Sequence, residues 1–130
     1  MASNGAGAIV DQFFAALSRK DLAAMRGLLR DDLAFTGPLA TLEGADAYLE
    51  GIQHATARMA DIRRRVAVAD GEDVLQVYDV FFEAPDGAPR SAVPVAEWLT
   101  VRDGRIAAIQ VILDTGPFTA AATATTGHAH

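Results

Sequence analysis

The stretch EWLTVRDGRIAAIQVILD, at residues 97–114, contains two largely apolar segments separated by the dipeptide Asp103-Gly104. An Asp-Gly pair accepts the positive φ angles of a tight hairpin turn, so we expect strands at residues 91–102 and 105–114. The sequence before this hairpin repeats the arrangement, with a strand pattern at residues 74–84 followed by the turn sequence PDGAP. The C-terminal half is therefore expected to form an antiparallel sheet of long hairpins.

The N-terminal half has the period of helices rather than strands. Apolar residues recur at helical spacing from Ala8, Asp21 can cap a second short helix, and a third helix is expected from about Ala45. The third helix should carry Tyr48 and Met59 on one apolar stripe. Helices followed by antiparallel strands favour an α+β fold, in which the helices pack on one face of a sheet that curls around a pocket.

Composition excludes several classes of function. The chain has 130 residues, of which 51% are hydrophobic and 22% are charged, and its formal net charge is −6. Nucleic-acid binding is disfavoured because phosphate contacts need a basic face. The absence of cysteine excludes disulfides and cysteine-ligated metals, and no apolar run reaches the roughly 18 residues of a membrane span.

The length predicts a single domain, which we place at residues 1–118, with a frayed start at residues 1–7 and a flexible tail at residues 119–130. The first residues lack the basic and apolar regions of a secretion signal, so we expect a cytoplasmic protein. The three histidines are scattered and form no metal-binding set, so we expect neither a metal nor another cofactor.

Three carboxylates lie within apolar strand segments, namely Asp79, Glu97 and Asp114. Because successive side chains of a strand point to opposite faces, residues at even spacing share a face. By this rule each of the three acids shares a face with mostly apolar side chains, and we predict that all three point into one apolar pocket. A buried carboxylate is costly unless it is paired or neutralised, so at least one pKa would rise. A neutral acid beside an ionised one could then protonate an epoxide or enolate oxygen while its partner activates water.

The same three positions also have purely structural explanations. Asp114 can cap the final strand, and Asp79 can pair with an arginine at the sheet edge. Tyr78 and Trp98 alternate against the acids, so we expect them on the outer surface of the sheet or in an interface.

Six further side chains are predicted to contact a ligand. Tyr48 would place a hydroxyl at the mouth of the pocket, Gln110 would orient a ligand carbonyl, and the others would supply an apolar lining. The predicted ligand-binding residues are Phe13, Phe35, Tyr48, Met59, Phe81 and Gln110.

The order of elements resembles the nuclear transport factor 2-like fold and, within it, the SnoaL-like branch of polyketide cyclases, steroid Δ-isomerases and limonene epoxide hydrolase. The segments that carry the resemblance are FFAALSRKDLAAMRGLLRDDLAFTGP, LEGADAYLEGI and EWLTVRDGRIAAIQVILD, and with the PDGAP hairpin they cover residues 9–118. The resemblance implies a cone-shaped α+β domain, with three N-terminal helices on a strongly curved, mostly antiparallel sheet. It also implies a small hydrophobic ligand and a homodimer formed through the open face of the sheet.

Compared residue by residue, the resemblance implies incomplete catalytic sets. The two acids of the epoxide hydrolase correspond to Asp79 and Asp114, but its arginine corresponds to Val77. The buried acid of the steroid isomerases corresponds to Glu97, whereas their oxyanion-hole tyrosine corresponds to Phe13.

Two functions stay open. One is cofactor-free acid–base conversion of a small hydrophobic molecule (epoxide hydrolysis, cyclisation or isomerisation) by the three acids. The other is a non-catalytic, dimeric ligand-binding or assembly module of the same fold.

Overall fold

The computed structural model describes residues 4–84 and 92–113, and it has the α+β architecture expected from the sequence. Three helices and six strands follow one another in the order α1 (Asn4–Ser18), α2 (Leu22–Gly27), β1 (Leu29–Thr36), β2 (Thr41–Glu43), α3 (Ala45–Thr56), β3 (Met59–Asp70), β4 (Asp73–Phe82), β5 (Val93–Arg102) and β6 (Arg105–Leu113). Within this part of the chain, no helix has both the length and the apolar character needed to cross a membrane.

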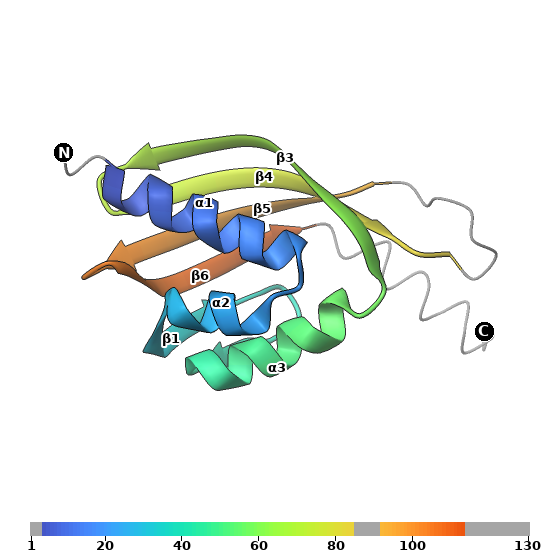
Figure 1. Cartoon of the computed structure of the whole chain (residues 1–130), viewed down its shortest axis with the longest axis horizontal. Coiled ribbons are helices and arrows are strands. Elements are labelled where there is room, and N and C mark those ends of the chain that lie inside the picture. The colour runs from blue at the N-terminus through green and yellow to red at the C-terminus, as the bar shows by residue number, and fades with distance from the viewer. Residues whose placement is uncertain (1–3, 85–91, 114–130) are drawn as a thin grey trace.

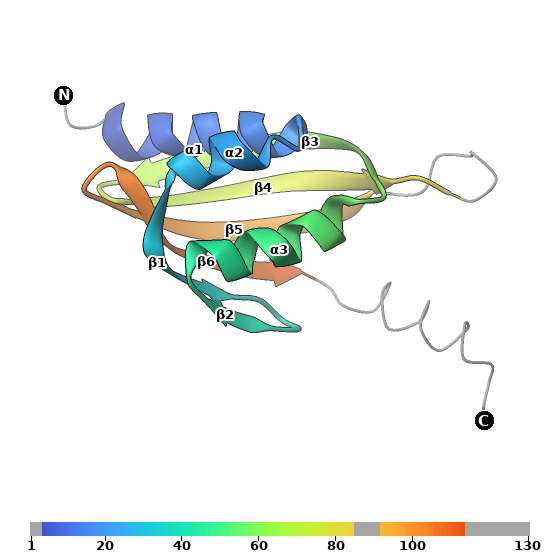
Figure 2. The same ribbon diagram turned by 60° about the horizontal axis from the view of Figure 1, so that its bottom comes forward.

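The six strands form one curved, mixed sheet in the order β2-β1-β6-β5-β4-β3. All neighbouring strands are antiparallel except β1 and β6, which run parallel. Figures 1 and 2 show that the three helices lie on one face of this sheet, with α1 along β3 and β4, and α3 beside β1 and β2. We call this helix-covered side the inner face and the opposite, open side the outer face.

Local sequence signals fix two of the element boundaries as predicted. The Asp21 carboxylate accepts a hydrogen bond from the Ala24 backbone N–H at 3.1 Å and so caps α2. Asp103 and Gly104 join β5 to β6 with φ angles of 55° and 79°, the positive values that a two-residue hairpin turn requires.

Other boundaries differ from the expectation. Helix α1 begins at Asn4 rather than at Ala8, and α3 ends at Thr56, so that Met59 opens β3 instead of extending the helical stripe. The PDGAP turn and the C-terminal tail lie outside the described residues.

The main hydrophobic core fills the space between α1, α2 and the inner face of the sheet. Side chains with no more than 1% exposure come from both layers and include Val10, Phe13, Met25, Leu29, Leu33, Val74, Leu99, Ile106 and Ile109. Helix α1 contacts β3, β4, β5 and β6, whereas α3 contacts β1 and β2. The packing therefore leaves room between α3 and the far halves of β4, β5 and β6, where the candidate site lies.

Candidate ligand-binding cavity

A cavity of 470 Å³ lies between α3, the β1–β2 hairpin and the inner face of the sheet. Its described wall is apolar except for Tyr48, Thr56, Tyr78 and Glu97, and it contains no lysine, arginine or histidine. The apolar wall consists of Leu17, Phe35, Gly37, Pro38, Leu39, Ala40, Leu42, Gly51, Ile52, Ala55, Met59, Ile62, Val80, Phe82, Val93, Val95, Val111 and Leu113. A cavity of this size and lining suits a small, largely apolar, uncharged molecule.

Glu97 supplies the carboxyl group found among the described residues of the cavity wall. It lies on the inner face of β5, only 3% exposed, and it shares that face with Val95 and Leu99, as alternation along the strand predicts. Gln76 Nε2 donates a hydrogen bond to Glu97 Oε1 at 2.8 Å, and the Tyr78 hydroxyl donates to Glu97 Oε2 at 2.9 Å. Both carboxyl oxygens are thus satisfied within the protein interior.

Burial raises the pKa of Glu97 above its usual range, because removal from water disfavours the charged form. The hydrogen bonds from Gln76 and Tyr78 act in the opposite direction and lower the pKa, but they do not cancel the effect of burial. Glu97 is therefore a carboxyl group that retains its proton at a higher pH than a carboxyl in water does.

Two tyrosines lie close to this acid in the cavity wall. Burial raises the pKa of both Tyr48 and Tyr78 well above the usual value, and the nearby charge of Glu97 raises them further. Both hydroxyls therefore stay protonated and available as hydrogen-bond donors.

Tyr48 differs from Tyr78 in having no hydrogen-bond partner among the residues that the structure describes. Its ring packs against Phe13, with the ring centroids 6.4 Å apart, and against Phe35 at 5.1 Å, and the residue is only 1% exposed. Its hydroxyl makes no hydrogen bond to any residue in the described ranges. A buried, unsatisfied hydroxyl in a cavity wall is available to a bound ligand or an ordered water molecule.

The structure separates Asp79 from the cavity, so the prediction that it shares a pocket with Glu97 is corrected. Asp79 lies on the outer face of β4, where its side chain is 15% exposed. Arg65 of β3 holds it by two hydrogen bonds, from Nε at 2.8 Å and from Nη2 at 2.7 Å. This bidentate ion pair matches the structural alternative for Asp79. Asp114 lies outside the described residues.

Three of the six predicted ligand-binding residues, Phe35, Tyr48 and Met59, line the cavity. The other three do not. Phe13 is fully buried behind Tyr48, Phe81 lies beneath the guanidinium of Arg63 at 5.2 Å, and Gln110 is exposed opposite Trp98. For Phe81 and Gln110 the position follows from strand parity, because both side chains point to the outer face.

Sequence reasoning placed Tyr78 on the outer surface and did not consider Gln76, yet both lie on the inner face and contact Glu97. The signal that could have identified them is cross-strand pairing. Gln76 and Glu97 are direct register partners, and a polar pair opposite one another on two apolar strands indicates a buried hydrogen bond.

The described part of the chain contains no group of three or more His, Asp or Glu side chains placed to hold a metal ion. The polar chemistry of the described cavity wall is that of one carboxyl group and three hydroxyl groups, of which that of Thr56 donates to the Ile52 backbone carbonyl at 2.8 Å.

The chain is similar to known proteins in sequence and in fold. The family model for the SnoaL-like domain matches residues 10–109. No curated protein matches the chain at a significant level.

Solved structures share the fold over nearly the whole chain. A protein from Kribbella flavida superposes with a TM-score of 0.84 at 25% identity, covering 97% of this chain and 100% of that one. A proposed polyketide cyclase from Xanthomonas campestris has a TM-score of 0.78 at 22% identity, covering 92% and 98% of the two chains. A protein from Catenulispora acidiphila with a ketosteroid isomerase-like fold, in complex with trimethylamine, has a TM-score of 0.70 at 21% identity, covering 82% and 85%.

Proposed function

Because this chain belongs to the family of SnoaL-like domains, we propose that it binds a small, uncharged, largely apolar molecule in the cavity and converts it by acid–base chemistry at Glu97. The observation that carries the proposal is a buried carboxyl group, with a raised pKa, in the wall of a 470 Å³ apolar cavity. A carboxyl group whose pKa is raised above its usual range keeps its proton more readily than an ordinary carboxyl and is suited to donate it to a substrate oxygen.

The lining favours a ligand with one polar end. An anionic ligand would have no positive side chain to pair with in the described wall, and it would lie close to Glu97. A carbonyl, enol or phenol oxygen can instead form hydrogen bonds with neutral Glu97 and with Tyr48, while the rest of the molecule contacts apolar side chains.

The placement of the acids supports some reactions more than others. Isomerisation and cyclisation move protons within one molecule and can proceed with a single acid–base group and hydroxyl donors beside it. Epoxide hydrolysis by two carboxylates would need a second acid in the cavity. Asp79 is bound to Arg65 on the outer face, and Asp114 lies outside the described residues. We therefore favour isomerisation or cyclisation.

A non-catalytic binding module is the second candidate. The observation in its favour is the position of Asp79 on the outer face, where it pairs with Arg65. Among the described residues of the cavity wall, Glu97 therefore has no second carboxylate beside it to act as a base. The two candidates agree on the ligand-binding cavity and differ only in whether Glu97 transfers a proton.

We further propose that the protein is a homodimer formed through the outer face of the sheet. Large apolar side chains are exposed there on adjacent strands β3 to β6, at Val66, Val68, Leu75, Trp98 and Ile112. Exposed apolar patches of this kind, with a central tryptophan, are typical of protein–protein interfaces.

Two variants that make the same chemical change on opposite faces of the sheet test the proposed function. A panel of uncharged ketones, enones and phenols is screened for thermal stabilisation and turnover with the wild type, Glu97→Gln and Asp79→Asn. We expect Glu97→Gln to lower kcat by about a hundredfold or more with little change in ligand affinity, and Asp79→Asn to change neither.

Each alternative result has a distinct meaning. Turnover that survives in Glu97→Gln contradicts the acid–base role of Glu97. Binding without turnover of any member of the panel favours the non-catalytic module. A panel in which no compound stabilises the protein contradicts ligand binding in the cavity.

A further inference from the structure

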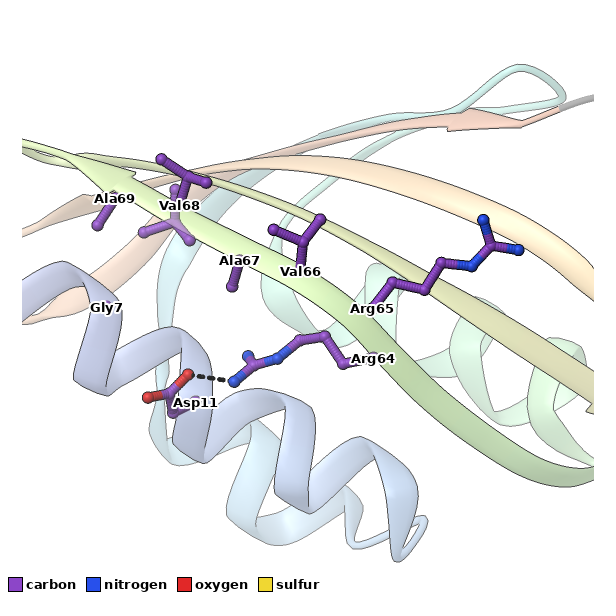
Figure 3. A pocket seen from close by; sticks show the side chains of 9 residues that line it. Gly7, Asp11, Arg64, Arg65, Val66, Ala67, Val68 and Ala69 are labelled. Carbon is purple, nitrogen blue, oxygen red and sulfur yellow. Dashed lines mark hydrogen bonds and ion pairs between the residues drawn. The ribbon is translucent and has the colours of Figure 1, made fainter.

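A chain of polar contacts connects the surface of α1 to the buried acid. Arg64 of β3 donates from Nη2 to Asp11 Oδ1 at 2.7 Å and from Nη1 to Gln76 Oε1 at 3.2 Å, and Gln76 Nε2 donates to Glu97 Oε1 at 2.8 Å. Figure 3 shows Arg64 turned toward Asp11, across a groove of 380 Å³ between α1 and β3, while Arg65 points away from α1. None of these contacts is required by the acid–base role of Glu97 itself.

The direction of each hydrogen bond in this chain follows from the chemistry of the guanidinium group. Arginine can only donate, so the group of Gln76 that faces Arg64 must be its carbonyl oxygen. The NH₂ group of Gln76 must then face Glu97 and donate to Oε1. An oxygen that accepts from an NH₂ group cannot at the same time present a proton to it. Any proton on Glu97 is therefore excluded from the side of Oε1 that faces Gln76.

We propose that Arg64 is a positioning residue, which orients the Gln76 amide so that the proton of Glu97 is held on Oε2, the oxygen beside Tyr78. The Tyr78 hydroxyl both donates and accepts, so it remains a partner of Oε2 whether Glu97 is neutral or ionised. A fixed proton position matters chemically only if the proposed function holds, but a titration of the carboxyl group detects it without any ligand.

Among the described charged and titratable groups around Glu97, Arg64 is the one that can orient the Gln76 amide. Tyr48 of α3 and Tyr78 of β4 are neutral near pH 7, because burial raises their pKa values. Asp11 of α1 has a side chain that is 60% exposed, so water screens its charge, whereas the side chain of Arg64 is 28% exposed. The remaining neighbour, Gln76, carries no charge.

Removing Arg64 should raise the pKa of Glu97. Without the guanidinium, the Gln76 amide is free to rotate and present its oxygen to Glu97, and an oxygen there can accept only from a protonated carboxyl. A neutral Glu97 would then be favoured over an ionised one. The chain from Asp11 to Glu97 cannot itself conduct a proton, because the arginine side chain has no acceptor with which to take up a proton from a neighbour.

The test is a ¹³C NMR titration of the glutamate side-chain carboxyl groups in the ligand-free protein, with the Glu97 signal assigned by its loss in Glu97→Gln. We expect Arg64→Met to raise the pKa of Glu97 by about one unit, a tenfold gain in proton affinity, and Arg64→Lys, which restores a donor and the charge, to reverse most of that shift. Arg65→Met is the matched control. It removes the neighbouring arginine, which binds Asp79 on the outer face, and it should leave the titration unchanged.

A double-mutant cycle separates orientation from simple loss of charge. In a Gln76→Met background the amide is absent, so Arg64→Met should produce little further change in the pKa of Glu97. An equal shift in both backgrounds would mean that Arg64 acts through its charge alone, and an unshifted pKa in Arg64→Met would mean that it does not act on Glu97; either result overturns the proposal. Should Arg64→Met fail to fold, Arg64→Ala supplies the same comparison. Because the titration needs no ligand, its result is independent of the search for turnover.

Discussion

Gln76 on β4 and Glu97 on β5 are register partners on the inner face of the sheet, and Gln76 Nε2 lies 2.8 Å from Glu97 Oε1. Each strand therefore supplies one half of a buried polar pair, which the hydroxyl of Tyr78 completes at 2.9 Å from Glu97 Oε2. Hydrogen bonds of this kind lower the cost of burying a carboxyl group, but they do not restore its hydration. Glu97 is therefore an acid whose protonation is coupled to folding.

This coupling predicts a pH-dependent stability difference between the wild type and Glu97→Gln. The folded protein holds the Glu97 proton above pH 4.5, the ordinary pKa, whereas the unfolded chain releases it there. The stabilising contribution of neutral Glu97 is thus complete below that pH and is lost as the pH rises through the folded-state pKa. Since glutamine does not titrate, the stability of Glu97→Gln minus that of the wild type should increase over this range, by about 1.4 kcal/mol for each unit of pKa shift.

Chemical denaturation from about pH 4 to about pH 8 measures this difference. Glu50→Gln, which makes the same chemical change at an exposed position of α3, is the control. A constant difference for Glu97→Gln would show that burial does not raise the pKa of Glu97.

Strand parity predicted the face of Glu97 correctly and that of Asp79 incorrectly, and the reason lies in the two strands. On β5 the inner positions other than Glu97 are apolar and the outer ones include Trp98 and Thr100, so alternation identifies the inner face. On β4 the outer positions carry Leu75, Val77 and Phe81, whereas the inner ones include Gln76 and Tyr78. The inner positions also carry Val74, Val80 and Phe82, so the two faces of β4 have similar apolar content and alternation alone does not identify the inner one.

The fold itself was predictable because its signals are local. The Asp103-Gly104 turn, the Asp21 cap and the helical spacing of α1 each depend on a few consecutive residues. The site depends on contacts across strands and between layers, such as Arg64 with Gln76, for which a single sequence carries little information. Membership of the cavity wall was therefore predicted for Phe35, Tyr48 and Met59 but missed for Tyr78.

The unsatisfied hydroxyl of Tyr48 predicts opposite effects of Tyr48→Phe on stability and on binding. In the ligand-free protein the variant loses no hydrogen bond to a described residue, so its Tm should equal or exceed that of the wild type. Affinity for a ligand whose oxygen contacts Tyr48 should fall by about tenfold, the cost of one lost hydrogen bond. Binding of 1-naphthol and of naphthalene, measured by fluorescence, provides a matched pair of probes.

Only the naphthol should lose affinity in Tyr48→Phe, because naphthalene has no oxygen to bind. Equal losses for both probes would mean that Tyr48 acts through packing against Phe13 and Phe35 rather than through its hydroxyl. A lowered Tm without ligand would mean that the hydroxyl already has a partner.

The cavity predicts that one valine of β5 tolerates enlargement and another does not. Val95 is 7% exposed and lines the cavity, whereas Val101 is 5% exposed on the same face and lies in the packed core away from it. Val95→Phe should fill the cavity, preserve the Tm and abolish binding of the aromatic probes. Val101→Phe should destabilise the protein by about 1–3 kcal/mol, because a packed core has no space for the added ring.

Thermal melting and probe binding of the two variants check this difference. A similar loss of stability in both variants would show that the space beside Val95 is not available to a ligand. Retention of probe binding by Val95→Phe would show that the probes bind elsewhere on the protein.

The outer face predicts a dimer that depends on Trp98. Trp98 is 45% exposed, and its indole N–H donates to Asp73 Oδ1 at 3.0 Å, so the ring is held in place on the open sheet beside Leu75 and Ile112. A fixed aromatic side chain at the centre of an apolar patch is the kind of residue that dominates interface energetics. Trp98→Lys should therefore weaken self-association by about tenfold or more, without loss of probe binding in the cavity on the opposite face. Sedimentation equilibrium over a range of protein concentrations measures the change.

Leu39→Lys is the control. Leu39 is 72% exposed but lies between β1 and β2, away from the outer face, and its substitution should leave the dimer intact. A wild-type protein that remains monomeric at all concentrations, or a Trp98→Lys variant that dimerises as the wild type does, would contradict an interface on this face.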